Sequence, residues 1–144
     1  MSCNTKKEIK SFDIEMNEYQ ELANASCFKG ITLNSLEDVI SNKKTCYIFL
    51  CYPQSDKCQL DIDYISKIAL EKEKVIYYMD IKEILKIQEA YSVLLKLLDP
   101  VLKEKQGSKL LDTPELIFIE KGEFKSYIIQ PDDLKLYESI FKED

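Results

Sequence analysis

The residues best placed to do chemistry lie in one stretch, residues 45–60, where an apolar run ends in a turn that contains proline. The turn carries Ser55, Asp56 and Cys58. Apolar residues at positions 58, 62, 65 and 69 have the spacing of one helical face, so a helix is expected to begin near Ser55. In α/β proteins, ligands bind where strands end and helices begin, because helix N-termini present free amide groups. This stretch is therefore the first candidate for a site.

The composition of the whole chain excludes several kinds of chemistry at such a site. The chain has 144 residues, no histidine and 3 glycines. Without histidine it cannot form a Ser-His or Cys-His nucleophile pair. Three scattered glycines form neither a phosphate-binding loop nor a dinucleotide fingerprint. The 5 cysteines lack the short paired spacing of a zinc site. The sequence therefore predicts no cofactor and no metal.

Charge and hydropathy limit the partners of the chain. The net charge is −6, from 20 basic and 26 acidic residues that are mixed along the sequence, so we expect no nucleic-acid partner. No apolar run is long enough for a membrane span, and residues 1–17 lack the apolar core of a secretory signal. We therefore expect a cytoplasmic protein. The odd number of cysteines favours free thiols over a disulfide framework.

Apolar periodicity predicts strands and helices that alternate along the chain. Expected helices cover residues 12–25, 34–42 with Asn34 or Ser35 as N-cap, 55–70, 81–98, 100–105 and 131–141. Expected strands cover residues 27–32, 45–51, 74–80, 114–120 and 123–129. The strands at 45–51 and 74–80 enclose one helix and are expected to be parallel, whereas the last two form an antiparallel hairpin. The sequence thus predicts an α/β domain over residues 27–144, preceded by a partly helical extension over residues 1–26.

This order of elements resembles the thioredoxin fold, a central mixed β-sheet flanked by helices. Residues 53–58, Pro-Gln-Ser-Asp-Lys-Cys, are similar to the active-site turn of that fold, in which Cys-x-x-Cys opens a helix. Thr113 and Pro114, before the hairpin, are similar to its cis-proline loop. The resemblance implies that the Thr113–Pro114 bond is cis and borders a groove for extended chains. Residues 51–58 most resemble the Gly-Arg-Pro-x-Cys-x-x-Cys turn of the bacterial bacteriocin transport accessory proteins.

The chain departs from this family at the nucleophile. Where the family has its first cysteine, this chain has Ser55, while the second cysteine is kept as Cys58. Thiol–disulfide exchange begins with an exposed thiolate, and a serine hydroxyl does not ionise near neutral pH. Asp56 further disfavours a nearby thiolate, and burial on the inward helix face would raise the pKa of Cys58. Ser55 is more simply explained as a helix N-cap and Cys58 as a buried core residue.

Three interpretations of function follow. The first is a redox-inactive thioredoxin-like protein that binds a protein or peptide, such as an accessory to bacteriocin transport; its binding residues would be Tyr52, Pro53, Gln54, Asp56, Thr113 and Pro114. The second is a thiol–disulfide oxidoreductase that uses Cys58 with Cys51 as partner, although inert strand cysteines are the favoured reading of Cys51 and Cys46. The third is a scaffold or homodimer that uses residues 81–105. The missing first cysteine favours the first interpretation.

Overall fold

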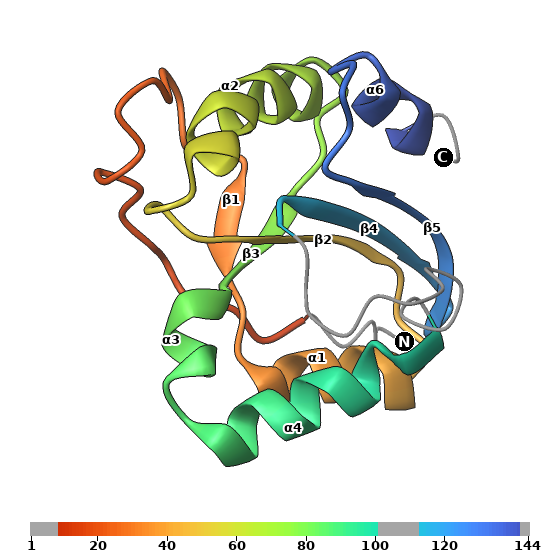
Figure 1. Ribbon diagram of the computed structural model, residues 1–144. Helices are drawn as coiled ribbons and strands as arrows, with labels where there is room; N and C mark the ends of the chain where they lie inside the picture. The colour runs from red at the N-terminus through yellow and green to blue at the C-terminus, as the bar shows by residue number, and fades with distance from the viewer. Residues whose placement is uncertain (1–8, 101–112, 142–144) are drawn as a thin grey trace.

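The computed structural model describes residues 9–100 and 113–141, and in these ranges a five-stranded mixed sheet forms the centre of the molecule (Figure 1). The strands are β1 (Phe28–Gly30), β2 (Cys46–Cys51), β3 (Ile76–Asp80), β4 (Glu115–Glu120) and β5 (Glu123–Ile129), in the spatial order β1-β3-β2-β4-β5. β3 is parallel to β1 and β2, whereas β4 is antiparallel to β2 and β5. The predicted parallel pair and the predicted hairpin are both confirmed.

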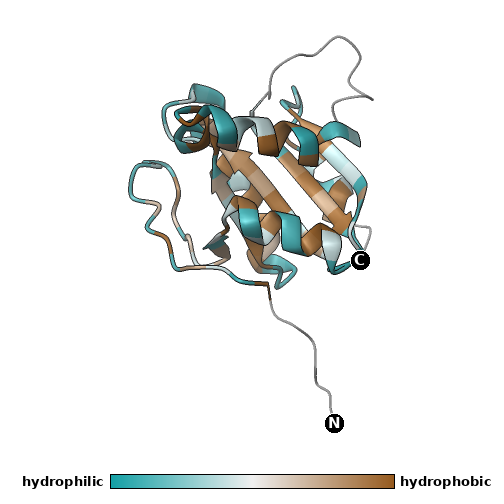
Figure 2. Cartoon of the chain, turned by 90° about the horizontal axis from the view of Figure 1, so that it is seen from below, coloured by the Kyte–Doolittle hydropathy of each residue, from teal (hydrophilic) through white to brown (hydrophobic). Residues whose placement is uncertain are grey.

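Helices cover both faces of the sheet. They are α1 (Leu33–Ser41), α2 (Asp56–Glu71), α3 (Ile81–Leu85), α4 (Gln88–Leu97) and α6 (Leu136–Ile140). α2 and α6 lie on one face, and α1 and α4 lie on the other (Figure 1). The strands between them are largely hydrophobic, whereas the helices combine hydrophilic and hydrophobic residues (Figure 2). The sheet is therefore the middle layer of three.

The central strand β2 shows why this layer is buried on both sides. Successive side chains of a strand point to opposite faces. Tyr47, Phe49 and Cys51 join the core under α2 and α6. The alternate residues Cys46, Ile48 and Leu50 join the core under α1 and α4. A strand buried on both faces must be apolar throughout, which explains the nearly continuous apolar run seen in the sequence.

The predicted helix over residues 12–25 is wrong. Residues 9–26 form turns and a β-bridge between Phe12 and Gly30. A surface helix is stabilised by burying a whole stripe of side chains, but here only Met16 and Tyr19 are fully buried, and Phe12 is half exposed. Residues 16–24, which we call the N-terminal strap, lie along α2 instead. The division into residues 1–26 and 27–144 stays a prediction.

Three helix boundaries also differ from those predicted. Thr32, not Asn34 or Ser35, is the N-cap of α1, and its hydroxyl accepts a hydrogen bond from the Ser35 amide at 3.1 Å. The predicted helix 81–98 is divided into α3 and α4, because Ile87 has an extended backbone. The last helix begins at Leu136 rather than near residue 131.

The predicted short helix at 100–105 lies almost wholly outside the described residues. Within the ranges that the structure describes, no helix has the length and apolar character needed to cross a membrane.

Candidate functional site

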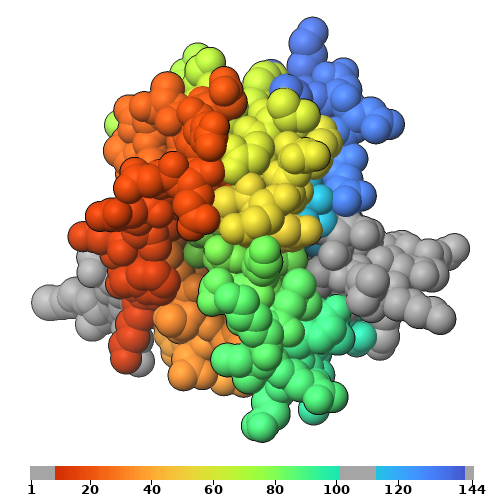
Figure 3. Space-filling view, turned by 60° about the vertical axis from the view of Figure 1, so that its left-hand side comes forward, coloured from red at the N-terminus to blue at the C-terminus, as the bar shows by residue number. Residues whose placement is uncertain are grey.

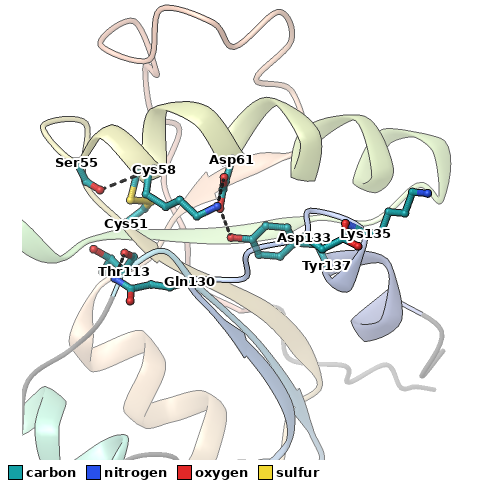
Figure 4. A network of polar contacts seen from close by, with 10 residues as sticks. Cys51, Ser55, Cys58, Asp61, Thr113, Gln130, Asp133, Lys135 and Tyr137 are labelled. Atoms are coloured by element: carbon teal, nitrogen blue, oxygen red, sulfur yellow. Dashed lines mark hydrogen bonds and ion pairs between the residues drawn. A yellow bond between two sulfur atoms is a disulfide. The ribbon is translucent and has the colours of Figure 1, made fainter. Parts of the chain in front are cut away.

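A disulfide joins Cys51, the last residue of β2, to Cys58 in the first turn of α2 (Figure 4). Their Cα atoms are 5.9 Å apart, and both residues are 0% exposed. The preference for an inert Cys51 is therefore wrong, whereas the expected burial of Cys58 in the core is confirmed. The turn at residues 52–55 reverses the chain, so the start of α2 returns over the end of β2. The two cysteines flank that turn, which was the only sequence signal for their pairing.

Ser55 is the N-cap of α2, as the sequence predicts. Its backbone is extended, with φ −86° and ψ 124°, and its hydroxyl accepts a hydrogen bond from the Cys58 amide at 3.2 Å. Asp56 follows in the first helical turn, where the helix dipole favours an acid. The Ser55 hydroxyl thus satisfies one of the free amides at the helix start, which stabilises the helix by about 1 kcal/mol. This contact gives Ser55 a structural role.

The loop at Thr113 and Pro114 lies beside the disulfide. β2 and β4 pair Leu50 with Glu115, so the next step of the antiparallel ladder brings Pro114 opposite Cys51. The Thr113–Pro114 peptide bond is cis. Gln130 supports the loop, because its side-chain amide donates to the Thr113 carbonyl at 2.8 Å and its backbone amide donates to the Pro114 carbonyl at 2.9 Å (Figure 4). The structure therefore brings the turn and this loop to the same edge of the sheet.

The other predicted binding residues form the outer surface of the turn. Tyr52 and Pro53 are half-buried, whereas Gln54 and Asp56 are exposed. The Ser55 amide donates to the Tyr52 carbonyl at 3.1 Å, which closes the turn. These residues are placed together, but their role in binding stays a prediction.

A buried acid that sequence reasoning missed lies one helical turn beyond the disulfide. Asp61 is 1% exposed, and its carboxylate contacts the Lys57 ammonium at 3.0 Å and accepts a hydrogen bond from the Tyr137 hydroxyl of α6 at 2.6 Å (Figure 4). Burial, and then the Asp61 carboxylate, raise the pKa of Tyr137. The sequence signal was an acid three residues after Cys58, in line with the inward face of the helix.

Two buried tyrosines connect the end of β2 to the N-terminal strap. The hydroxyls of Tyr19 and Tyr78 lie 2.5 Å apart, and the Tyr78 hydroxyl donates to the Cys51 carbonyl at 3.5 Å. Burial raises the pKa of both tyrosines, so both stay protonated and available as donors. Tyr78 belongs to the core, and its hydroxyl adds a polar contact there.

Asp80 also lies at this edge of the sheet. It is paired with Cys51 across β2 and β3, and its side chain accepts a hydrogen bond from the Lys82 amide at 2.9 Å, which caps α3. Partial burial raises the pKa of its carboxyl group, although hydrogen bonds from the amides of Lys82 and Glu83 act against that shift.

Cys27 and Cys46 are the free cysteines of the described part of the chain, and both are buried. Burial raises the pKa of Cys27 to about 11 and that of Cys46 to about 12, so neither forms a thiolate near neutral pH. Across residues 9–100 and 113–141, no cluster of three or more cysteine, aspartate or glutamate side chains is arranged to hold a metal ion. The groups available for chemistry at this end of strands β2 and β3 are thus one disulfide and the polar groups around it.

Comparison with known proteins gives matches at the level of structure only. No family model and no curated protein sequence matches the chain. A thioredoxin-fold protein assigned as an oxidoreductase is similar to it, with 12% identity, a TM-score of 0.60 and coverage of 83% of this chain and 96% of that one. Thioredoxin O2 from Arabidopsis thaliana, in its oxidised state, has 17% identity, a TM-score of 0.56 and coverage of 82% and 94%. The Malassezia sympodialis thioredoxin has 17% identity, a TM-score of 0.54 and coverage of 78% and 87%.

At these identities the similarity defines the fold and leaves the function to be argued from the site. The chain has a thioredoxin-like fold, with a mixed sheet between two layers of helices. The predicted fold class is confirmed.

Proposed function

We propose that this thioredoxin-like protein binds an extended protein or peptide segment beside the Thr113–Pro114 loop and does not turn over disulfides. The observation that carries the proposal is the state of the turn before α2. Thiol–disulfide exchange needs an exposed thiolate at this helix N-terminus. The position instead holds Ser55, whose hydroxyl accepts a hydrogen bond from the Cys58 amide. The Cys51–Cys58 disulfide is fully buried. A substrate disulfide therefore meets no exposed thiol at this turn.

The surface around the loop suits an extended partner. Tyr52 and Pro53 offer half-buried apolar surface, and Gln54 offers an exposed amide next to them. An extended chain that pairs with backbone groups gains affinity from main-chain hydrogen bonds and specificity from neighbouring side chains. The turn would supply those side chains, and the Thr113 amide would supply the backbone donor, because the carbonyls of Thr113 and Pro114 already accept hydrogen bonds from Gln130.

The nature of the partner is a further part of the proposal. The resemblance of residues 51–58 to the turn of the bacteriocin transport accessory proteins supports a peptide that is destined for export, met in the cytoplasm. The gene neighbourhood of the chain tests this part. Genes for a small peptide precursor and its exporter beside it would support the assignment, and a neighbourhood without either would remove it while leaving the binding role intact.

A reductase assay tests the absence of turnover. With insulin as substrate and dithiothreitol as electron donor, we expect the wild-type protein to leave the rate of insulin precipitation at its uncatalysed value. The matched variant is Cys58→Ala, which removes the disulfide. Catalysis by the wild type that disappears in Cys58→Ala would overturn the proposal.

Such a result would establish the second candidate, a thiol–disulfide oxidoreductase. The observation in its favour is the disulfide itself, which lies at the end of a central strand under the start of α2. Because both sulfur-bearing residues are fully buried, this mechanism requires residues 52–57 to move before a substrate thiolate can reach either sulfur. A trapped mixed disulfide between a substrate and the Cys51→Ser variant would identify Cys58 as the attacking thiol.

A further inference from the structure

The N-terminal strap contacts the loop closed by the Cys51–Cys58 disulfide at two places. The first contact is made by the buried tyrosines. Tyr19 is the strap residue that enters the core, where it is 3% exposed and packs edge-on against Tyr78, with ring centroids 5.9 Å apart. Tyr78 in turn donates to the carbonyl of Cys51. The strap therefore reaches the disulfide through a single intervening side chain.

The second contact is made by Gln59, the residue that follows Cys58. Its side-chain nitrogen donates to the Pro53 carbonyl of the turn at 2.7 Å and to the Glu18 carbonyl of the strap at 2.8 Å. Its side-chain oxygen accepts from the Gln20 amide at 3.1 Å. Gln59 thus holds the turn and the strap at the same time, and a movement of one disturbs the other.

Farther along α2 the strap is held through its main chain. The Ala23 amide donates to the Asp63 carboxylate at 3.0 Å, and the Ser66 hydroxyl donates to the Asn24 carbonyl at 2.5 Å. Figure 3 shows the strap lying against α2 along this line. Apart from Met16 and Tyr19, no residue of the strap is fully buried. A segment with so few buried anchors is expected to open at a lower free energy than the sheet.

We propose that the disulfide and the N-terminal strap form a redox-controlled latch, in which the closed strap shields the Cys51–Cys58 bond and reduction of that bond releases the strap. The reductant is a dithiol. Its thiolate bonds to one cysteine sulfur, the S–S bond breaks, and the other cysteine leaves as a thiolate that takes a proton from water. The second thiol of the reductant then displaces the first cysteine, which is also protonated, so the protein gains two electrons and two protons while the dithiol becomes a disulfide.

The two halves of the latch are linked by thermodynamic reciprocity. If reduction weakens strap docking by some factor, strap release must favour reduction by the same factor. This inference does not depend on a partner at the Thr113 loop, because strap and disulfide belong to the same chain. It describes one reversible event per molecule, not substrate turnover.

The first test measures how fast dithiothreitol reduces the disulfide in the native full-length protein, by quenching with an alkylating agent and counting modified Cys51 and Cys58 by mass spectrometry. Gln59→Ala removes the shared contacts from a side chain that is only half-buried, and we expect reduction to be at least about fivefold faster, given the worth of such hydrogen bonds. The control is Val39→Ala in α1, on the opposite face of the sheet, which destabilises the whole fold.

The control separates local opening from global unfolding. We expect Val39→Ala to change the reduction rate less than about twofold under native conditions, because global unfolding is rare. Equal rates in the wild type and Gln59→Ala would overturn the proposal. So would an acceleration in Val39→Ala as large as that in Gln59→Ala, because the disulfide would then be reduced through the unfolded chain.

The second test measures hydrogen exchange of strap amides in the oxidised and the reduced protein. The amides of Gln20 and Ala23 both donate to α2 side chains, and we expect both to exchange faster after reduction. The Gly122 amide, which donates to the Lys44 carbonyl at 2.9 Å at the far end of the sheet, is the reference, because its exchange accelerates only as far as loss of the disulfide destabilises the whole fold. Unchanged exchange at Gln20 and Ala23, or the same acceleration at Gly122, would contradict the latch.

Discussion

At the scale of single residues, Ser55 accounts for how the turn keeps its shape without the usual thiol. Serine is among the best N-cap residues, and the Ser55 hydroxyl accepts a hydrogen bond from the Cys58 amide at 3.2 Å. This contact could be predicted from the sequence, because a cap depends on residues only three positions apart. The contact of Asp61 with Tyr137 could not, because these residues are 76 positions apart and belong to helices that meet only in the folded chain.

Ser55→Cys should restore the missing chemistry. The new thiol would lie at the N-terminus of α2, where the dipole lowers its pKa, and one turn from Cys58. We expect the variant to exchange its pairing in part from Cys51–Cys58 to 55–58 and to gain measurable insulin reduction. Peptide mapping under non-reducing conditions checks the pairing. A variant with the wild-type pairing and no activity would mean that the turn does not present residue 55 as a thioredoxin turn presents its first cysteine.

Tyr137→Phe should destabilise the fold by about 1.5–3 kcal/mol, because it removes a hydrogen bond to the buried Asp61 carboxylate. Tyr64→Phe is the matched control, since Tyr64 of α2 bonds the Glu138 carboxylate of α6 at the exposed surface. Exposed contacts of this kind contribute little, so we expect Tyr64→Phe to lose much less stability than Tyr137→Phe. Urea unfolding measures both values. Equal losses in the two variants would show that burial of Asp61 is not what makes its contact strong.

At the scale of elements, the predictions succeeded where one local pattern decides the structure. The strand at β2 and the start of α2 each follow from a few neighbouring residues, and both lie close to their predicted positions. The helix predicted over residues 12–25 failed because apolar spacing does not reveal whether a core is available for it to cover. Phe12 and Gly30 instead exchange two backbone hydrogen bonds in a β-bridge, and a Cβ at Gly30 would clash with the Phe12 ring. The path of residues 9–26 thus depends on a contact between distant segments that no local pattern encodes.

The start of α3 offers a pH test. Burial is the main reason that the pKa of Asp80 lies above that of an ordinary aspartate, so the folded protein binds this proton more tightly than the unfolded chain does. The contribution of Asp80 to stability is therefore fully present below the unfolded pKa and is lost as pH rises through the folded pKa. Asp80→Asn keeps a good N-cap without the charge. We expect it to be more stable than the wild type at pH 7 and not at pH 3, as measured by thermal unfolding. A gain of the same size at both pH values would contradict the assigned cause.

At the scale of the whole molecule, the resemblance of the sequence to thioredoxins placed the correct elements around the correct edge of the sheet. It could not supply the Cys51–Cys58 pairing, because two cysteines that flank a turn pair only if that turn returns the helix over the strand. It also could not supply the strap, whose backbone groups bond α2 side chains that lie 39 to 41 positions away in the sequence. The fold was thus more predictable than the features that distinguish this chain within it.

The position of the two cysteines in the sequence has a consequence for the unfolded chain. They are only seven positions apart, so their bond closes a short loop. Even a loop this short removes many conformations from the unfolded ensemble, which in chain-entropy terms stabilises the folded state by about 2.5 kcal/mol. A typical domain is stable by only about 5–15 kcal/mol. The fraction of unfolded molecules, and with it their exposure to proteases, should therefore rise by nearly two orders of magnitude when the surroundings become reducing.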